Sequence, residues 1–147
     1  MRKTFLFIFA ITPMVLGLGG FAMAQKQMKP KTLTINLSGG AEVPGPGDKD
    51  GSGQAKLTVN HDKSEVCYAI TVKNIDKPTM AHIHAGAAGA AGDVKVKLEP
   101  DAKGAWKGCA KADHAILQEL TTTPANFYVN VHNAEFPNGA VRGQLGK

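Results

Sequence analysis

The sequence predicts an all-β fold, an antiparallel β-sandwich, from three observations. Short segments of alternating apolar and polar residues recur along the 147-residue chain, as expected for strands with one buried face. Turn residues separate these segments about every ten residues. No segment carries a long helical period, so helices are not expected to form a layer. Seven or eight short strands of this kind are typical of a sandwich.

The first half of the chain contains three clear strand patterns. They lie at 32–37, 55–60 and 65–72. The Gly- and Pro-rich stretch between the first two predicts a long loop. In the second strand, Leu57 and Val59 are expected to point inward. The third strand alternates most cleanly and follows a hairpin turn predicted at Asp62-Lys63-Ser64.

The second half predicts five further strands. They are expected around His82 and at 94–98, 105–109, 127–132 and 141–145. A Gly- and Ala-rich loop follows the His82 strand; because a strand and not a helix comes next, it is not a phosphate-binding motif. Lys95 and Lys97 alternate with apolar residues, which indicates a strand wetted on one side. Residues 115–120 are the only expected helical turn, and Pro124 ends that region.

The N-terminus predicts export. Two basic residues precede an apolar run from Phe5 to Leu18, and Ala22-Met23-Ala24 supplies the small residues of a cleavage site. We therefore expect a signal peptide at 1–24, a flexible leader at 25–31 and one domain at 32–147. The apolar run is short for a bilayer span, and no longer one follows it. The mature protein is expected in a periplasm or the medium.

Charge argues against a nucleic-acid partner. The formal net charge is +5 and falls to about +3 when Arg2 and Lys3 leave with the signal peptide. Lys26, Lys29 and Lys31 lie in the expected leader and form a solvated tail. No basic stripe of the kind that binds phosphate backbones is present in the sequence.

Two cysteines, Cys67 and Cys109, favour a single disulfide. An even count in an exported chain is typical of a bridge. It would close a loop of about 40 residues and contribute a few kcal/mol. The alternative is a copper site that uses a thiolate.

The stretch from Met80 to Gly86 contains the strongest candidate ligands. In a strand, His82 and His84 point to one side with Met80, and the imidazoles stand roughly 7 Å apart. Two such rings can converge on one metal ion, since a histidine nitrogen binds a transition metal at about 2 Å. The alternative is a pair of surface histidines on a solvated sheet face.

A third imidazole follows from the strand at 127–132. Its apolar residues share one face, and Tyr128, Asn130 and His132 share the other. If this strand neighbours the His82 strand, three histidines meet. His61 and His114 lie outside these patterns and are expected at the surface; the alternative is that either joins the metal site.

Three motifs together indicate a family. They are His82-Ile83-His84-x-Gly86, Gly40-Ala41-Glu42-Val43-Pro44, and Tyr128-Val129-Asn130-Val131-His132 with Pro137-x-Gly139-x-Val141-Arg142-Gly143-Gln144-Leu145. From about Leu33 onward the chain resembles the CHRD domain, a module named after chordin that also occurs as a free-standing exported bacterial protein. The resemblance implies an immunoglobulin-like Greek-key sandwich, distantly similar to copper-zinc superoxide dismutase. It implies little about activity.

The superoxide dismutase similarity can be followed residue by residue. His82 and His84 match that family's copper-binding His-x-His pair, His132 matches a later copper ligand, and Arg142 loosely echoes an arginine that guides the anionic substrate. No histidine matches the metal-bridging position, and the zinc-loop pattern is absent between Gly86 and Val94. A zinc site is therefore not expected, and dismutase activity is not favoured.

These residues leave three functional hypotheses. The first is binding, carriage or sequestration of copper, which leads the Irving–Williams order for nitrogen ligands, by His82, His84 and His132 with Met80 as a possible axial ligand. The second is a metal-free adhesion or protein-interaction module. The third is a dismutase-like redox enzyme, for which only Arg142 argues. Met80 has an alternative role as a hydrophobe at a strand start, and Arg142 as a partner of Glu42 or Glu135. No acid–base motif favours an enzyme.

Overall fold

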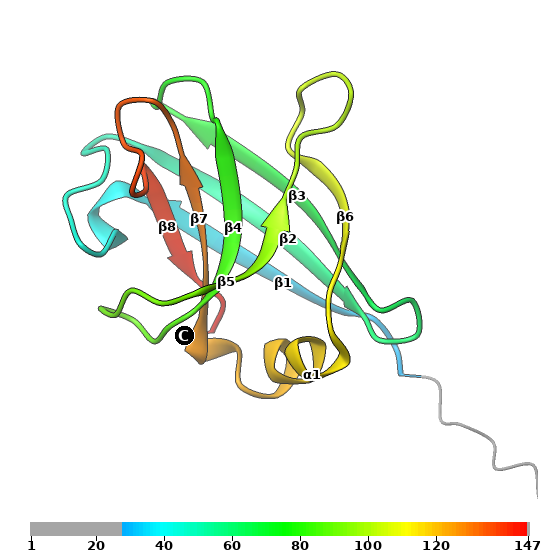
Figure 1. Ribbon diagram of the computed structural model, residues 1–147. Coiled ribbons are helices and arrows are strands. Elements are labelled where there is room, and N and C mark those ends of the chain that lie inside the picture. The colour runs from blue at the N-terminus through cyan, green and yellow to red at the C-terminus, as the bar shows by residue number, and fades with distance from the viewer. Residues whose placement is uncertain (1–27, 147) are drawn as a thin grey trace, which may run out of the picture.

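Within residues 28–146, eight antiparallel strands form one sheet that curls until its two edges nearly meet (Figure 1). The computed structural model describes residues 28–146, so the signal peptide expected at 1–24 lies outside the described residues. The elements in chain order are β1 (Lys31–Ser38), the 3₁₀ turn η1 (Gly39–Ala41), β2 (Ser52–Asn60), β3 (Glu65–Lys73), β4 (Met80–Ala85), β5 (Val94–Leu98), β6 (Lys107–Lys111), α1 (His114–Thr122), η2 (Pro124–Asn126), β7 (Phe127–His132) and β8 (Val141–Gln144). The predicted all-β antiparallel class is confirmed.

The strand order shows that the two halves of the predicted sandwich are joined into one nearly closed barrel. It runs β5-β4-β7-β8-β1-β2-β3-β6, and the two halves join where β8 meets β1 at the pair Arg142 and Ser38. At the opposite seam, the Tyr68 hydroxyl of β3 donates to the Glu99 carbonyl at 2.7 Å and accepts from the Glu99 N–H at 2.8 Å. This pair of hydrogen bonds ties the end of β5 to the far half of the sheet.

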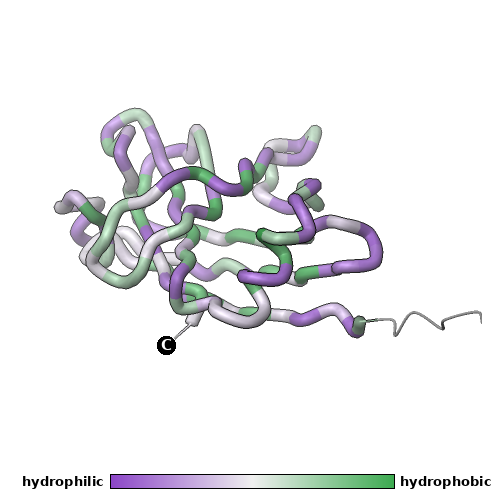
Figure 2. The backbone as a smooth tube through the Cα atoms, turned by 60° about the horizontal axis from the view of Figure 1, so that its bottom comes forward, coloured by the Kyte–Doolittle hydropathy of each residue, from purple (hydrophilic) through white to green (hydrophobic). Residues whose placement is uncertain are grey.

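The core fills the space inside this curled sheet. Hydrophobic and hydrophilic residues alternate along the strands (Figure 2), and the inward residues form one buried cluster. Leu57 and Val59 are fully buried, as predicted. On β4, Ala81 and Ile83 point into the core, so the histidines between and after them lie on the outer face.

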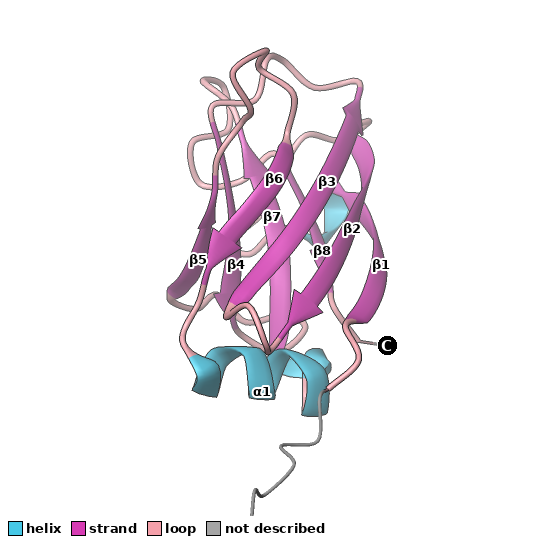
Figure 3. Cartoon of the chain, turned by 90° about the vertical axis from the view of Figure 1, so that its right-hand side faces the viewer, coloured by secondary structure: helices cyan, strands magenta, loops and turns pink. Residues whose placement is uncertain are grey.

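Helix α1 covers one end of the barrel (Figure 3). Leu117 and Leu120 are its buried residues and close the core there. The helix is longer than the turn predicted at 115–120. Its last turn holds Thr121 and Thr122, whose hydroxyls donate to the Gln118 carbonyl at 2.9 Å. Those side-chain bonds support a threonine-rich turn that propensity alone disfavours.

Strand β6 begins two residues later than the predicted 105–109. The Asp101 carboxylate accepts hydrogen bonds from the N–H groups of Lys103 and Ala105, which hold this segment in a turn. Cys109 then lies directly opposite Cys67 of β3. The predicted disulfide between them is confirmed, with an S–S distance of 2.02 Å. Among residues 28–146, no helix combines the length and apolar character needed to cross a bilayer.

Candidate metal centre

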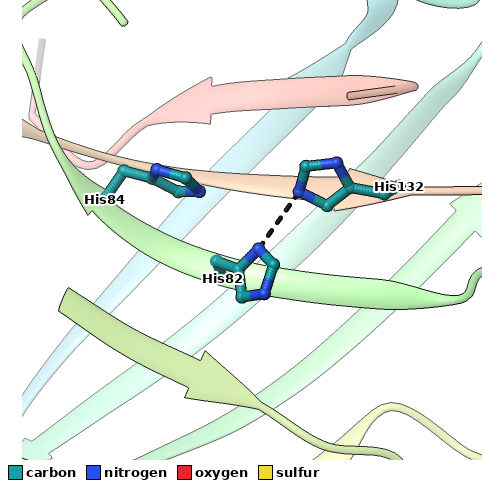
Figure 4. Close-up of side chains that lie close together, drawn as sticks. All are labelled: His82, His84 and His132. Atoms are coloured by element: carbon teal, nitrogen blue, oxygen red, sulfur yellow. Dashed lines mark hydrogen bonds between the residues drawn. The ribbon is translucent and has the colours of Figure 1, made fainter. Parts of the chain in front are cut away.

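The three predicted histidines meet because β4 and β7 are direct neighbours. In the antiparallel register, Met80 lies opposite His132 and His82 lies opposite Asn130. All these side chains share the outer face of the sheet. The rings of His82, His84 and His132 point toward one another (Figure 4). Each offers a ring nitrogen, and the three nitrogens lie within 4.8 Å of one another.

Backbone carbonyls set the tautomers of two rings. His84 Nδ1 donates to the Gly92 carbonyl at 2.8 Å, and His132 Nδ1 donates to the Pro137 carbonyl at 3.0 Å. Because a carbonyl can only accept, the proton of each neutral ring lies on Nδ1, and Nε2 keeps its lone pair. His84 Nε2 is buried and has no hydrogen-bond partner. A carbonyl behind each ring is the usual outer support of a metal-binding histidine.

The third ring, His82, faces the cluster with Nδ1 instead of Nε2. His82 Nδ1 lies 3.1 Å from His132 Nε2, and the two ring centroids are 5.0 Å apart. His82 is also the most exposed of the three histidines. The cluster therefore offers one Nδ1 and two Nε2 atoms, a set of three imidazole donors that suits copper, zinc or nickel.

The surroundings of His82 and His132 keep these two rings uncharged. Burial lowers the pKa of His82 to about 4, helped by the positive charges that His132, His84 and Lys97 would place nearby. Burial also lowers the pKa of His132, although its hydrogen bond to the Pro137 carbonyl acts in the opposite direction. At neutral pH both rings are neutral, which is the form that binds a metal ion.

The loops 86–93 and 133–140 contact the outer face of β7, which the sequence marks only as polar. All six residues of β7 are buried. The loop 86–93 is held down by Arg142, whose Nη2 donates to the Ala87 and Ala90 carbonyls at 3.1 and 2.9 Å. In this loop Gly92 lies against the Ala85 backbone, where any Cβ would collide. Glycine is therefore required at the position whose carbonyl supports His84.

Tyr128 connects the centre to Arg142. Strands β4 and β8 flank β7, and the Tyr128 ring contacts a side chain from each of them. The His84 ring stacks on it with centroids 4.7 Å apart, and the Arg142 guanidinium carbon lies 3.4 Å from its centroid. The Tyr128 hydroxyl also accepts a hydrogen bond from the Gly92 N–H at 3.2 Å. Arg142 is thus engaged by an aromatic face and carbonyls and does not join the histidine cluster.

The expected acidic partner of Arg142 is not bonded to it. Among residues 28–146, no ion pair joins Arg142 to Glu42 or Glu135. Arg142 is 2% exposed and Glu42 is 6% exposed. Burial raises the pKa of Glu42 to about 7, and the nearby Arg142 charge and the Val43 N–H only partly oppose this shift.

Other predicted residues lie elsewhere. Met80, the possible axial ligand, is 45% exposed at the start of β4. His61 and His114 form a separate pair between the β2–β3 turn and α1, with ring centroids 5.5 Å apart. The prediction of a surface position is wrong for His61, which is 7% exposed because its ring lies beside α1, 3.4 Å from the Thr121 hydroxyl.

Asn130 is a residue that the sequence did not single out. Its side chain is almost fully buried, and its amide oxygen lies 3.0 Å from His132 Nε2. Its position two residues before His132, on the polar face of the same strand, is the sequence signal that could have identified it.

Comparison with known families gives one match. The model of the CHRD domain matches residues 33–145, which confirms the resemblance expected from the three motifs. No curated protein and no solved structure matches the chain. The similarity to copper-zinc superoxide dismutase is therefore not confirmed.

Proposed function

The chain belongs to the CHRD domain family, and from this premise we propose that it is an exported module that binds one copper ion through His82, His84 and His132. Its role is binding, carriage or sequestration of the ion. Export is supported by the Cys67–Cys109 disulfide, since such bonds persist in oxidising compartments, and by the signal peptide predicted at 1–24.

One observation carries the proposal. His84 Nε2 is buried without a partner, while the same ring donates its only proton to the Gly92 carbonyl. A buried lone pair that nothing binds lowers the free energy of unfolding by about 1–3 kcal/mol. A metal ion held jointly with His82 and His132 removes that cost and uses the convergence of the three rings.

The donor atoms favour copper. Three imidazole nitrogens do not suit calcium or magnesium, which bind oxygen ligands. Among divalent first-row ions, copper binds most tightly to a site of this type. Arg142 supports no redox step, because its guanidinium is engaged by Tyr128 and loop carbonyls.

The test is titration of the purified untagged protein with Cu(II) and Zn(II), by calorimetry and by metal analysis after dialysis. We expect one retained copper ion per chain. In His132→Ala we expect the copper affinity to fall by at least about 100-fold. Removing a residue that only supports a ligand lowers metal affinity by about 10–100-fold, and removing the ligand itself should cost no less.

The matched control is His114→Ala. His114 is an exposed histidine in another part of the molecule, so its loss tests for scattered surface chelation without disturbing the core. Equal losses in the two variants would refute the site. No retained copper in the wild-type protein would leave a metal-free interaction module.

A further inference from the structure

Asn130 lies at the centre of the outer face that carries the histidines. In the sheet register it is opposite His82 on β4 and Arg142 on β8, and His132 follows two residues later on the same face. The side chain is 3% exposed. A buried amide in this place must have polar partners, because an unpaired one is costly.

Its partner is a ligand nitrogen. The Asn130 amide oxygen lies 3.0 Å from His132 Nε2. His132 Nδ1 donates to the Pro137 carbonyl, so in a neutral ring Nε2 is an acceptor. The amide oxygen is also an acceptor. Two acceptors at this distance are reconciled when a cation binds both, or when the amide turns and donates its NH₂ group to Nε2.

We propose that the Asn130 amide oxygen is a fourth donor of the metal centre and makes the site selective for Cu(II) over Cu(I). This inference rests on the proposed function. In the metal-free protein the same side chain donates its NH₂ group to His132 Nε2; in the loaded protein it turns over and presents oxygen. Three imidazoles and one amide oxygen are a harder donor set than one that contains sulfur.

Met80 is the competing fourth donor, and the two residues differ in place. Met80 is 45% exposed at the start of β4, whereas Asn130 is buried beside a ligand nitrogen. A thioether would favour Cu(I), and an amide oxygen favours Cu(II). The identity of the fourth donor therefore decides which oxidation state the protein holds.

The experiment compares Asn130→Leu, Asn130→Asp and Met80→Leu with the wild-type protein. Cu(II) alone is added, and the ligand atoms are read from frozen-solution electron paramagnetic resonance. The Cu(II) and Cu(I) affinities are measured separately by competition with chelators. Circular dichroism of each metal-free variant checks the fold.

We expect Asn130→Leu to lower the Cu(II) affinity about tenfold, to change the resonance spectrum, and to leave the Cu(I) affinity within about twofold. Asn130→Asp keeps the shape and adds charge, so it should bind Cu(II) more tightly than the wild type, and this result can be read even if the leucine variant misfolds. Met80→Leu should match the wild type.

Three results overturn the inference. Wild-type spectra and Cu(II) affinities in both Asn130 variants would remove Asn130 from the centre while leaving the three-histidine site intact. A loss of Cu(I) affinity in Met80→Leu, with no effect of Asn130→Asp on Cu(II), would assign the fourth position to sulfur. If the wild-type protein retains no copper, the proposed function fails and this inference fails with it.

Discussion

The molecule holds two groups of histidines with equally close rings, yet only one group has the three converging nitrogens that could hold a metal ion. His82 and His84 have ring centroids 5.5 Å apart, and so do His61 and His114. In the first group, carbonyls of Gly92 and Pro137 fix which nitrogen keeps a lone pair. In the second, the neighbour of His61 Nε2 is the Thr121 hydroxyl, 3.4 Å away, which donates its own proton to the Gln118 carbonyl.

Closeness of the rings is therefore not sufficient for a metal site. The first group has a third ring and two carbonyl supports, and loops held by Arg142 and Asn133 cover it. The second group has one buried and one exposed ring beside a helix. Outer hydrogen bonds that orient two of the three rings distinguish this candidate centre from two packed imidazoles.

The largest expected effect tests the difference between the two histidine groups directly. His82→Ala should lower copper affinity by at least about 100-fold, because it removes a ligand. His61→Ala should leave copper affinity unchanged but lower the free energy of unfolding by about 1–3 kcal/mol, since it empties a buried position beside α1. Calorimetric copper titration and urea unfolding measure the two quantities. Similar copper losses in both variants would show that the groups do not differ in function.

A second prediction concerns the stability of the loops beside the first group. Because burial raises the pKa of Glu42 to about 7, its protonated form stabilises the fold below about pH 4.5, and that contribution is lost as the pH rises through 7. A shift of this size is worth about 3 kcal/mol, reduced to about 2 kcal/mol by partial solvation. Urea unfolding at several pH values measures the loss.

Glu42→Gln supplies the control. The amide does not titrate, so the fall in stability between pH 5 and 8 should be smaller by about 2 kcal/mol. Copper affinity at pH 7 should not change, because Glu42 lies outside the donor set. An unchanged pH profile in this variant would mean that another group causes the loss.

A third prediction sharpens the role of the outer supports. Tyr128→Phe removes the hydroxyl that accepts the Gly92 N–H, while the ring that stacks on His84 remains. Since one hydrogen bond contributes about 1 kcal/mol, copper affinity should fall about fivefold. The control is Thr121→Val, which removes the hydroxyl beside His61 and should not alter copper binding. A Tyr128→Phe affinity equal to wild type would show that Gly92 keeps its place without this bond.

The smallest expected effect is that of pH on copper binding. Because burial lowers the pKa values of His82 and His132, protons compete with copper only in acid. Copper affinity should change by less than about twofold between pH 7 and 8 and fall steeply below pH 5. A fall centred near pH 6.5, the ordinary histidine pKa, would mean that the rings are more solvated than their burial indicates.

Local periodicity was sufficient for much of the fold. The spacing of His82 and His84 placed both rings on one face, and Cys67 with Cys109 predicted the bridge that is present. Strand β7 was placed with its observed ends. The observed β6 begins later than predicted, and the observed α1 is longer than predicted. The Asp101 turn and the threonine hydroxyls act at these places through side-chain hydrogen bonds, which periodicity does not contain.

Alternation, spacing and motif were sufficient to predict most of the strands, the shared face of His82 and His84, the family and the disulfide. Long-range contacts set the rest: β4 pairs with β7, His84 and His132 are buried, and Asn130 faces His132 Nε2. The pairing joins strands more than 40 residues apart. Such contacts arise from closure of the sheet around a shared core, and local patterns do not specify which strands become neighbours.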